Sequence, residues 1–185
     1  MTANFNLERK KTALLIVDIQ DKLFSQVERS CEVLLTIQKL IKGFKILNLP
    51  ILVSEQYPKG LGATIATIKA SLDEDQDYLI KTSFSCLKEP TIKEKMLNLK
   101  IDQWVIAGME AHVCVLQTAK DLINIGKEVV VLNDAITSRS LYDFSTAISE
   151  MRDCGVRISS TETILFELLG DSQADEFKEM SQLIK

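Results

Sequence analysis

The feature that most constrains the fold is a series of short, unbroken apolar runs that alternate with longer segments of helical periodicity. Strands that face solvent on one side alternate apolar and polar residues, whereas strands covered on both faces are apolar throughout. We therefore expect strands of a parallel sheet packed between two layers of helices. The runs occupy residues 12–17, 51–53, 78–80, 103–107, 128–132 and 156–158.

The segments between the runs carry apolar residues three and four apart, a spacing that packs one face of a helix on a sheet. The longest helix is expected over residues 28–47 and ends before Pro50, which a helix interior excludes. Other helices are expected over residues 64–72, 91–97, 143–153, 161–169 and 174–184, with one more ending near residue 125. This alternation predicts an α/β fold, a three-layer α/β/α sandwich with a six-stranded parallel sheet of Rossmann-like topology. No linker interrupts it, and we expect a single domain over residues 1–185.

Composition and charge narrow the classes of function. The chain of 185 residues has a net charge of −4 and its basic residues are spread out, so we expect no nucleic-acid partner and no membrane binding. No apolar run approaches the roughly 20 residues of a membrane-spanning helix, and residues 1–10 lack the apolar core of a signal peptide. A cytoplasmic location is the expectation. Four widely spaced cysteines and one histidine predict neither a disulfide framework nor a metal site, and we expect no cofactor.

Three reactive side chains follow three of the predicted strands. Asp18 follows the first, Lys81 follows the third, and the fourth leads into a turn that carries Cys114 near the start of a helix. Ligands of open parallel sheets bind beside the carboxyl ends of the strands, so these side chains can share one crevice. A helix N-terminus and a nearby ammonium favour a thiolate, and Asp18 can take the thiol proton and later activate water. The pattern predicts covalent catalysis by Cys114.

Other interpretations of these residues stay open. Cys114 can be a buried structural thiol, since free cysteine is among the most buried residue types. Asp18 and Lys81 can form a simple ion pair at the edge of the sheet. His112 can be the base of a Cys–His pair, but residues two apart on a helix do not face each other, so we expect it to line a pocket or the surface. The glycine motifs of dinucleotide-binding, phosphate-binding and serine-hydrolase sites are absent.

Three segments resemble the signature segments of the isochorismatase-like cysteine hydrolases. They are Leu15-Ile-Val-Asp-Ile-Gln20, Lys81-Thr-Ser-Phe-Ser85 and Gly108-Met-Glu-Ala-His-Val-Cys-Val115. The resemblance covers essentially the whole chain. It implies a triad of Asp18, Lys81 and Cys114 and a homo-oligomer, either a dimer or a tetramer. It also implies a cis peptide bond between Glu110 and Ala111, which would aim backbone N–H groups of the turn leading to Cys114 at a developing oxyanion.

Departures from the family pattern narrow the implied activity. Nicotinamidases of this fold bind a metal through an Asp-x-His motif and a further histidine, and a chain whose single histidine is His112 cannot supply that site. Isochorismatase itself lacks a cysteine at the matching position, so Cys114 argues against vinyl-ether hydrolysis. Residues 54–62 instead resemble the isochorismatase-domain-containing subgroup, which includes trypanosomatid proteins named as mitochondrial ribonucleases. The acidic charge balance argues against nuclease chemistry here.

The sequence therefore predicts a hydrolase that cleaves a small-molecule amide C–N bond through a Cys114 thioester. Loops 54–62 and 135–142, with help from a neighbouring subunit, are expected to set specificity. Two other functions stay open, namely a binding or scaffold protein whose triad does not turn over and a redox-sensing thiol. The expected substrate contacts are Gln20, Phe24, Tyr57, Phe84 and His112.

Overall fold

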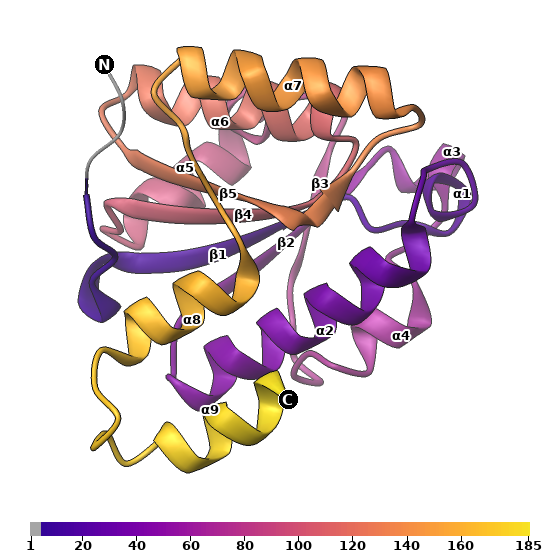
Figure 1. Cartoon of the computed structure of the whole chain (residues 1–185). Coiled ribbons are helices and arrows are strands. Elements are labelled where there is room, and N and C mark those ends of the chain that lie inside the picture. The colour runs from indigo at the N-terminus through magenta and orange to yellow at the C-terminus, as the bar shows by residue number, and fades with distance from the viewer. Residues whose placement is uncertain (1–4) are drawn as a thin grey trace.

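The computed structural model describes residues 5–185 and contains one six-stranded sheet between two layers of helices (Figure 1). All strand pairs are parallel, and the strand order is β3-β2-β1-β4-β5-β6. The predicted three-layer α/β/α fold is confirmed. The strands are β1 (Thr12–Val17), β2 (Ile51–Gln56), β3 (Tyr78–Lys81), β4 (Gln103–Met109), β5 (Glu128–Thr137) and β6 (Arg157–Ser159).

The helices divide between the two faces of the sheet. They are α1 (Asp21–Phe24), α2 (Ser30–Ile46), α3 (Pro58–Leu61), α4 (Ala66–Lys69), α5 (Pro90–Asn98), α6 (Leu116–Asn124), α7 (Leu141–Asp153), α8 (Thr161–Leu169) and α9 (Phe177–Ile184). In Figure 1, α5, α6 and α7 cover one face, and α2, α8 and α9 cover the other. Two apolar cores result, one that includes Trp104 beneath α5–α7 and one that includes Phe44 beneath α2. Across the described residues, no helix is both long and apolar enough to cross a membrane.

The strand order places a topological switch point between β1 and β4. From β1 the chain adds β2 and β3 on one side, and it then returns through α5 to place β4 on the other side of β1. The connections that leave the carboxyl ends of β1 and β4 therefore run in opposite directions, and such switch points are where α/β sheets bind ligands. Asp18 follows β1, and the turn that carries Cys114 follows β4.

The close contact between β1 and β4 depends on Gly108. Gly108 pairs with Val17 across the two strands and has a φ of +136°, a conformation that favours glycine. A Cβ atom at this position would lie 2.2 Å from the backbone oxygen of Val17. No side chain fits there, so the glycine allows the two strands beside the switch point to pair.

Two strands, β2 and β5, extend three or more residues past the predicted runs, both at their carboxyl ends. Residues 54–56 belong to β2 and residues 133–137 belong to β5, although both segments were expected to be loops. Their polar side chains find partners inside the protein. Asp134, for example, accepts hydrogen bonds from the backbone N–H and the hydroxyl of Thr161 at the start of α8, at 3.0 and 3.1 Å. The helix expected over residues 64–72 is shorter, and the remaining ends differ from prediction by three residues at most.

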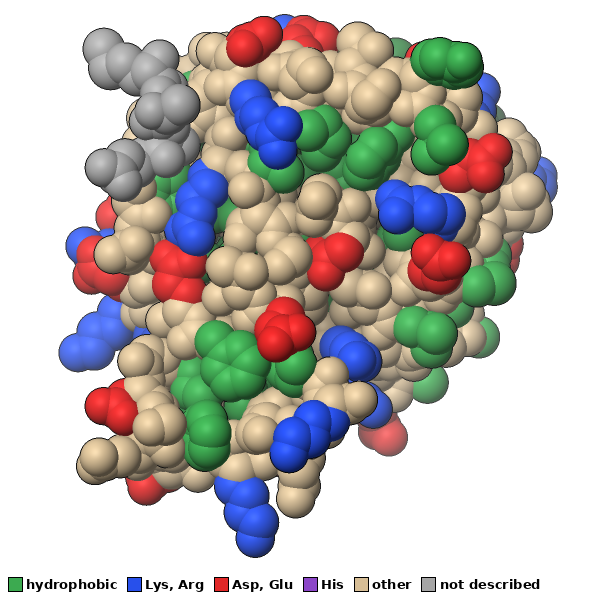
Figure 2. All heavy atoms as spheres, viewed as in Figure 1, with side chains coloured by type: hydrophobic (Ala, Val, Ile, Leu, Met, Phe, Trp, Pro, Cys, Tyr) green, Lys and Arg blue, Asp and Glu red, His purple; other side chains and the backbone are tan. Residues whose placement is uncertain are grey.

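The surface mixes charges of both signs. On the face shown in Figure 2, basic and acidic side chains are interspersed. Several form ion pairs, such as Lys45 with Asp73 at 2.6 Å and Arg9 with Glu176 at 2.9 Å. This face therefore carries no single-sign stripe of the kind that binds a nucleic-acid backbone.

Candidate active site

Strand alternation brings several polar side chains to one face of the sheet. Ser54 and Gln56 lie two residues apart on β2 and share a face with Leu52, which belongs to the core beneath α5–α7. Lys81 is the direct neighbour of Gln56 across the β2–β3 pair. Cys114 packs in the same core. The polar ends of β2 and β3 therefore lie on the side of the sheet that carries the thiol.

Asp18 and Lys81 form a buried ion pair. Asp18 leaves β1 with a left-handed backbone (φ +54°), which aspartate tolerates better than most residues. Nζ of Lys81 lies 2.7 Å from Oδ2 of Asp18, and both side chains are 0% exposed. Ser54 on β2 donates a hydrogen bond to the other carboxylate oxygen at 2.8 Å. The expected convergence is present, although β2 separates the two strands that carry the pair.

Lys81 has a second partner on β2. Its Nζ donates to Oε1 of Gln56 at 2.6 Å. Burial lowers the pKa of Lys81, but the charge and hydrogen bond of Asp18, together with the charges of Cys86 and Cys114, outweigh this effect and leave the pKa above its ordinary value. The lysine therefore stays an ammonium at neutral pH and remains a donor.

Cys114 lies in a π-helical turn, Ala111–Val115, which directly precedes α6. Such turns occur frequently at functional sites. The residue is 4% exposed. Burial raises the pKa of the Cys114 thiol, the Asp18 carboxylate raises it further, and Lys81 opposes both. At neutral pH the group is therefore a thiol beside a charged pair, and it must lose its proton before it can attack.

The cis peptide bond expected between Glu110 and Ala111 is not present, and this prediction was wrong. Throughout residues 5–185 the structure has no cis peptide bond. The turn is closed instead by the backbone N–H groups of Val113 and Val115, which donate to the carbonyl of Glu110 at 3.1 and 3.4 Å. A non-proline cis bond costs about 3–4 kcal/mol, and this trans turn avoids that cost. The Glu110 side chain is buried and forms an ion pair with Arg139.

Gln20, an expected substrate contact, has its amide occupied by backbone groups. Its Nε2 donates to the carbonyls of Gln56 and Gly62, at 3.0 and 2.5 Å, and its Oε1 accepts the Gln56 N–H at 2.7 Å. The left-handed turn at Asp18 takes the chain out of β1, and the Gln20 side chain then replaces β1 as the partner of β2. Gln20 thus holds the end of β2 in place.

The side chains of the other four expected substrate contacts make no hydrogen bond to Asp18 or Lys81, although the backbone N–H of Tyr57 donates to the carbonyl of Lys81 at 2.8 Å. Tyr57 and Phe84 are 53% and 54% exposed, and Phe24 is half-buried. His112 lies with Nδ1 at 3.0 Å from Oγ of Ser138, just beyond β5. Their contact with a substrate stays a prediction.

Sequence reasoning missed Ser54, Gln56 and Cys86. Ser54 and Gln56 lie on the same face of β2. Their spacing of two residues would have indicated this if the predicted strand had been extended past residue 53. Cys86 is fully buried, and its backbone N–H donates at 3.0 Å to the hydroxyl of Thr118, one turn after Cys114. Burial, helped by the charge of Asp18, raises the pKa of Cys86 to about 11. No sequence pattern marks this second thiol of the site.

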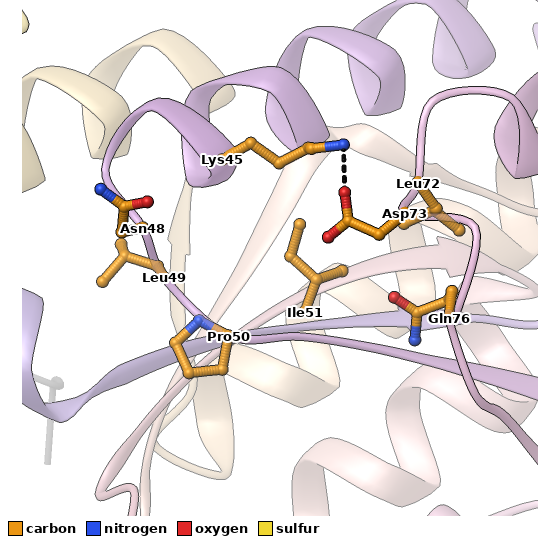
Figure 3. Close-up of a pocket in the computed structure, with 8 residues that line it drawn as sticks. All are labelled: Lys45, Asn48, Leu49, Pro50, Ile51, Leu72, Asp73 and Gln76. Atoms are coloured by element: carbon orange, nitrogen blue, oxygen red, sulfur yellow. Dashed lines mark ion pairs between the residues drawn. The ribbon is translucent and has the colours of Figure 1, made fainter.

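Neither a metal cluster nor the pocket drawn in Figure 3 coincides with these residues. Within the part of the chain that the structure describes, no three His, Cys, Asp or Glu side chains are grouped to hold a metal ion. A pocket of about 530 Å³ lies at the amino end of β2, the end of the sheet opposite the ion pair (Figure 3). Its lining residues are Lys45, Asn48, Leu49, Pro50, Ile51, Leu72, Asp73 and Gln76.

Comparison with known proteins places the chain in a family. A family model described as "Isochorismatase domain" matches residues 12–163, most of the chain, including Asp18, Lys81 and Cys114. The chain belongs to the isochorismatase family. Isochorismatase domain-containing protein 2 of Danio rerio is 36% identical over 179 residues, which cover 96% of this chain and 89% of that protein. The family resemblance drawn from the three sequence segments is confirmed.

Solved structures of similar proteins agree with the isochorismatase-family fold. The structure of MAR1 ribonuclease from Caenorhabditis elegans has a TM-score of 0.91 and 37% sequence identity, and the match covers 97% of this chain and 92% of that one. The YcaC gene product of Escherichia coli has a TM-score of 0.92 and 22% identity, with 100% and 91% coverage. The second match shows the fold alone. Family membership supports a hydrolase-type fold for this chain.

Proposed function

We propose that this isochorismatase-family chain is a cysteine-dependent hydrolase of small, uncharged amides, with Cys114 as the nucleophile. The observation that carries the proposal is the buried pair of Asp18 and Lys81 acting on a thiol in the first turn before α6. A base, a cation and a nucleophile within one dry cluster are the parts that covalent hydrolysis needs.

The proposed reaction begins when Asp18 takes the proton of the Cys114 thiol. The sulfur attacks the amide carbon, and the carbonyl electron pair moves to oxygen, where Lys81 and backbone N–H groups of the turn from Glu110 to Cys114 stabilise the negative charge. Collapse breaks the C–N bond as Asp18 returns the proton to the departing nitrogen. Asp18 then deprotonates water, and the resulting hydroxide displaces the sulfur from the thioester as a thiolate. The acid leaves as Asp18 returns its proton to the Cys114 sulfur, which restores the starting state.

The charge of the cluster favours an uncharged substrate. Asp18 and Lys81 neutralise each other, and Cys114 enters as a neutral thiol. A phosphodiester would bring a negative charge into the cluster. The ammonium of Lys81 is already paired with Asp18, so the added charge would be buried without a partner, which is costly. RNA is nevertheless the second substrate to test, because a relative with 37% identity is named a ribonuclease.

The test compares wild type with Cys114→Ser and Cys114→Ala on a panel of small amides. We expect wild type to release acid and amine and to accumulate an acyl-enzyme that intact-mass spectrometry detects. Both variants should lose turnover by at least about 1,000-fold, since members of a catalytic unit fail together. Cys31→Ser, which changes an exposed cysteine, is the matched control and should behave as wild type.

Three results would contradict the proposal. Undiminished amide turnover in Cys114→Ala would remove the cysteine from the mechanism. RNA cleavage that depends on Cys114, without amide turnover, would reassign the site to nuclease chemistry. Absence of both activities and of any acyl-enzyme would favour a binding protein.

A further inference from the structure

Strand β2 places two neutral side chains beside the buried ion pair, and each binds one of its members. Ser54 Oγ donates to Oδ1 of Asp18 at 2.8 Å, and Oε1 of Gln56 accepts from Nζ of Lys81 at 2.6 Å. Asp18 and Lys81 meet through the remaining carboxylate oxygen at 2.7 Å. The orientation of the pair is therefore fixed by a strand to which neither charged residue belongs.

Gln56 is itself held at its backbone and at its tip. Its Nε2 donates to the carbonyl of Thr82 at 2.8 Å, which leaves Oε1 for Lys81. Its backbone N–H and carbonyl both bond the side-chain amide of Gln20. Gln56 is 8% exposed, so water competes little for these bonds. A side chain locked in this way is a fixed acceptor, which a precise site requires.

The donors of Lys81 can be counted. An ammonium has three N–H groups, and Lys81 gives one to Asp18 and one to Gln56. One remains, and Cys114 packs in the core on the same face of the sheet, where the charge of Lys81 lowers the pKa of its thiol. The amide oxygen of Gln56 accepts a hydrogen bond from Lys81 without neutralising the ammonium. A carboxylate at this position would add negative charge beside the sulfur.

The geometry points to Gln56 as a positioning residue that accepts one N–H of Lys81 and thereby directs another at the sulfur of Cys114. This inference rests on the proposed role of Cys114 as the nucleophile, and it names the residue that decides where Lys81 donates. Gln56 acts through Lys81 and touches no reacting atom.

The experiment follows alkylation of Cys114 by iodoacetamide as a function of pH, measured by mass spectrometry of the labelled peptide. Gln56→Met keeps the length of the side chain and removes the acceptor. We expect the midpoint of the profile to move to higher pH and the rate at neutral pH to fall by about 3- to 10-fold, because a pKa change of one unit is a tenfold change in thiolate. No substrate is needed.

A matched control separates positioning from loss of stability. Gln103 is also a buried glutamine, with four hydrogen bonds, but it lies at the amino end of β4. Gln103→Met should leave the Cys114 profile unchanged. In a Lys81→Met background, Gln56→Met should have no further effect, since its partner is gone. If Lys81→Met does not fold, Gln56→Glu replaces it and should raise the midpoint through its added charge.

An unchanged profile in Gln56→Met, an equal shift in Gln103→Met, or a shift that persists without Lys81 would each overturn the inference. An unchanged midpoint in Gln56→Glu would do the same. The outcomes also separate the two proposals. If Cys114→Ser abolishes amide hydrolysis while Gln56→Met leaves the profile unchanged, the inference alone fails. If the profile shifts but no amide is turned over, the proposed function fails and the positioning role stands.

Discussion

Asp18 combines a strained backbone with a fully buried charge. The left-handed conformation costs an aspartate roughly 1–2 kcal/mol or less, since its short polar side chain tolerates this region. The carboxylate is stabilised by Ser54 and Lys81, which together occupy both of its oxygens. Strain of this kind persists where the surrounding structure holds it, and it gathers at functional sites. The backbone at Asp18 turns the chain out of the sheet and leaves the carboxylate beneath the thiol-bearing turn.

Opposite changes to the two charges should move the reactivity of Cys114 in opposite directions. Asp18→Asn keeps a residue that tolerates the left-handed turn and removes the charge that raises the pKa of the Cys114 thiol. We expect that pKa to fall and iodoacetamide labelling at neutral pH to accelerate by about tenfold per unit, with amide hydrolysis lost. Lys81→Met should slow labelling, because Lys81 lowers the same pKa. Peptide mass spectrometry measures both, with exposed Cys31 as the internal reference.

Shifts of the same sign in both variants would contradict this account of the ion pair. Labelling of Cys86 supplies a further check within the same samples. Its pKa of about 11 and its complete burial should keep it unlabelled at neutral pH as long as the chain is folded.

Among the elements, the pair of β1 and β4 carries most of the site, because Asp18 and the turn with Cys114 follow their carboxyl ends. Their register places Val17 opposite Gly108, one residue before Asp18 and six before Cys114. The spacing between Asp18 and Cys114 therefore depends on how closely these two strands approach. That approach is limited at Gly108, where any side chain meets the backbone of β1.

Gly108→Ala should destabilise the protein far more than a comparable change elsewhere. Gly155 has a φ of +89° and no atom within 4 Å of the added Cβ, so Gly155→Ala tests the backbone cost alone. We expect that control to lose about 1 kcal/mol. Gly108→Ala should lose more than about 4 kcal/mol or fail to fold, since overpacking against backbone cannot relax. Urea unfolding measures both, and equal losses would contradict the steric account.

Sequence patterns predicted elements well wherever burial made the chain apolar. The runs of β1 and β4 predicted the strands, and the charged residues at the ends of two apolar runs, Asp18 after β1 and Lys81 as the last residue of β3, gave half of the site. The polar continuation of β2 was not predictable, because Ser54 and Gln56 are buried against partners that lie far away in sequence. The peptide bond before Ala111 was taken from a family resemblance, and local hydrogen bonding decided it otherwise. The homo-oligomer implied by the same resemblance stays a prediction.

At the scale of the whole molecule, helix α8 joins the segment before β1 to strand β6. Glu167 on this helix accepts the backbone N–H of Leu7 at 2.6 Å and binds Arg157 of β6 at 2.8 and 2.5 Å. Arg9 reaches the carbonyl of Leu168 at 2.6 Å. These contacts attach the segment before β1 to β6, the last strand, and to α8, the helix that follows it.

The Glu167 contacts should make stability depend on pH. Partial burial raises the pKa of Glu167, but hydrogen bonds from Arg157 and Leu7 outweigh this and leave the pKa below its ordinary value of 4.5. The ionised form therefore contributes stability above that value, and the contribution is lost as pH falls through the folded pKa. Glu167→Gln should lower the free energy of unfolding at neutral pH by about 1–3 kcal/mol.

Urea unfolding at a series of pH values checks this prediction. The difference between wild type and Glu167→Gln should shrink as the pH falls below about 4 and then disappear, because both side chains are then neutral. Glu162, an exposed glutamate on the same helix, supplies the control, and Glu162→Gln should change little at any pH. A difference that persists unchanged into acid would mean that Glu167 acts through shape alone.

The alternation along β2 limits how proteins of this kind can change during evolution. Ser54 and Gln56 face the ion pair, while Glu55 between them faces the other core. Insertion or deletion of one residue within this strand would exchange the two faces and bring a carboxylate to the lysine. The segment that follows, residues 57–77, contains no strand, so the insertion of one residue there exchanges no pair of faces. Lineages that acquire new substrates can therefore lengthen or shorten that segment freely, while the strand before it must keep its length.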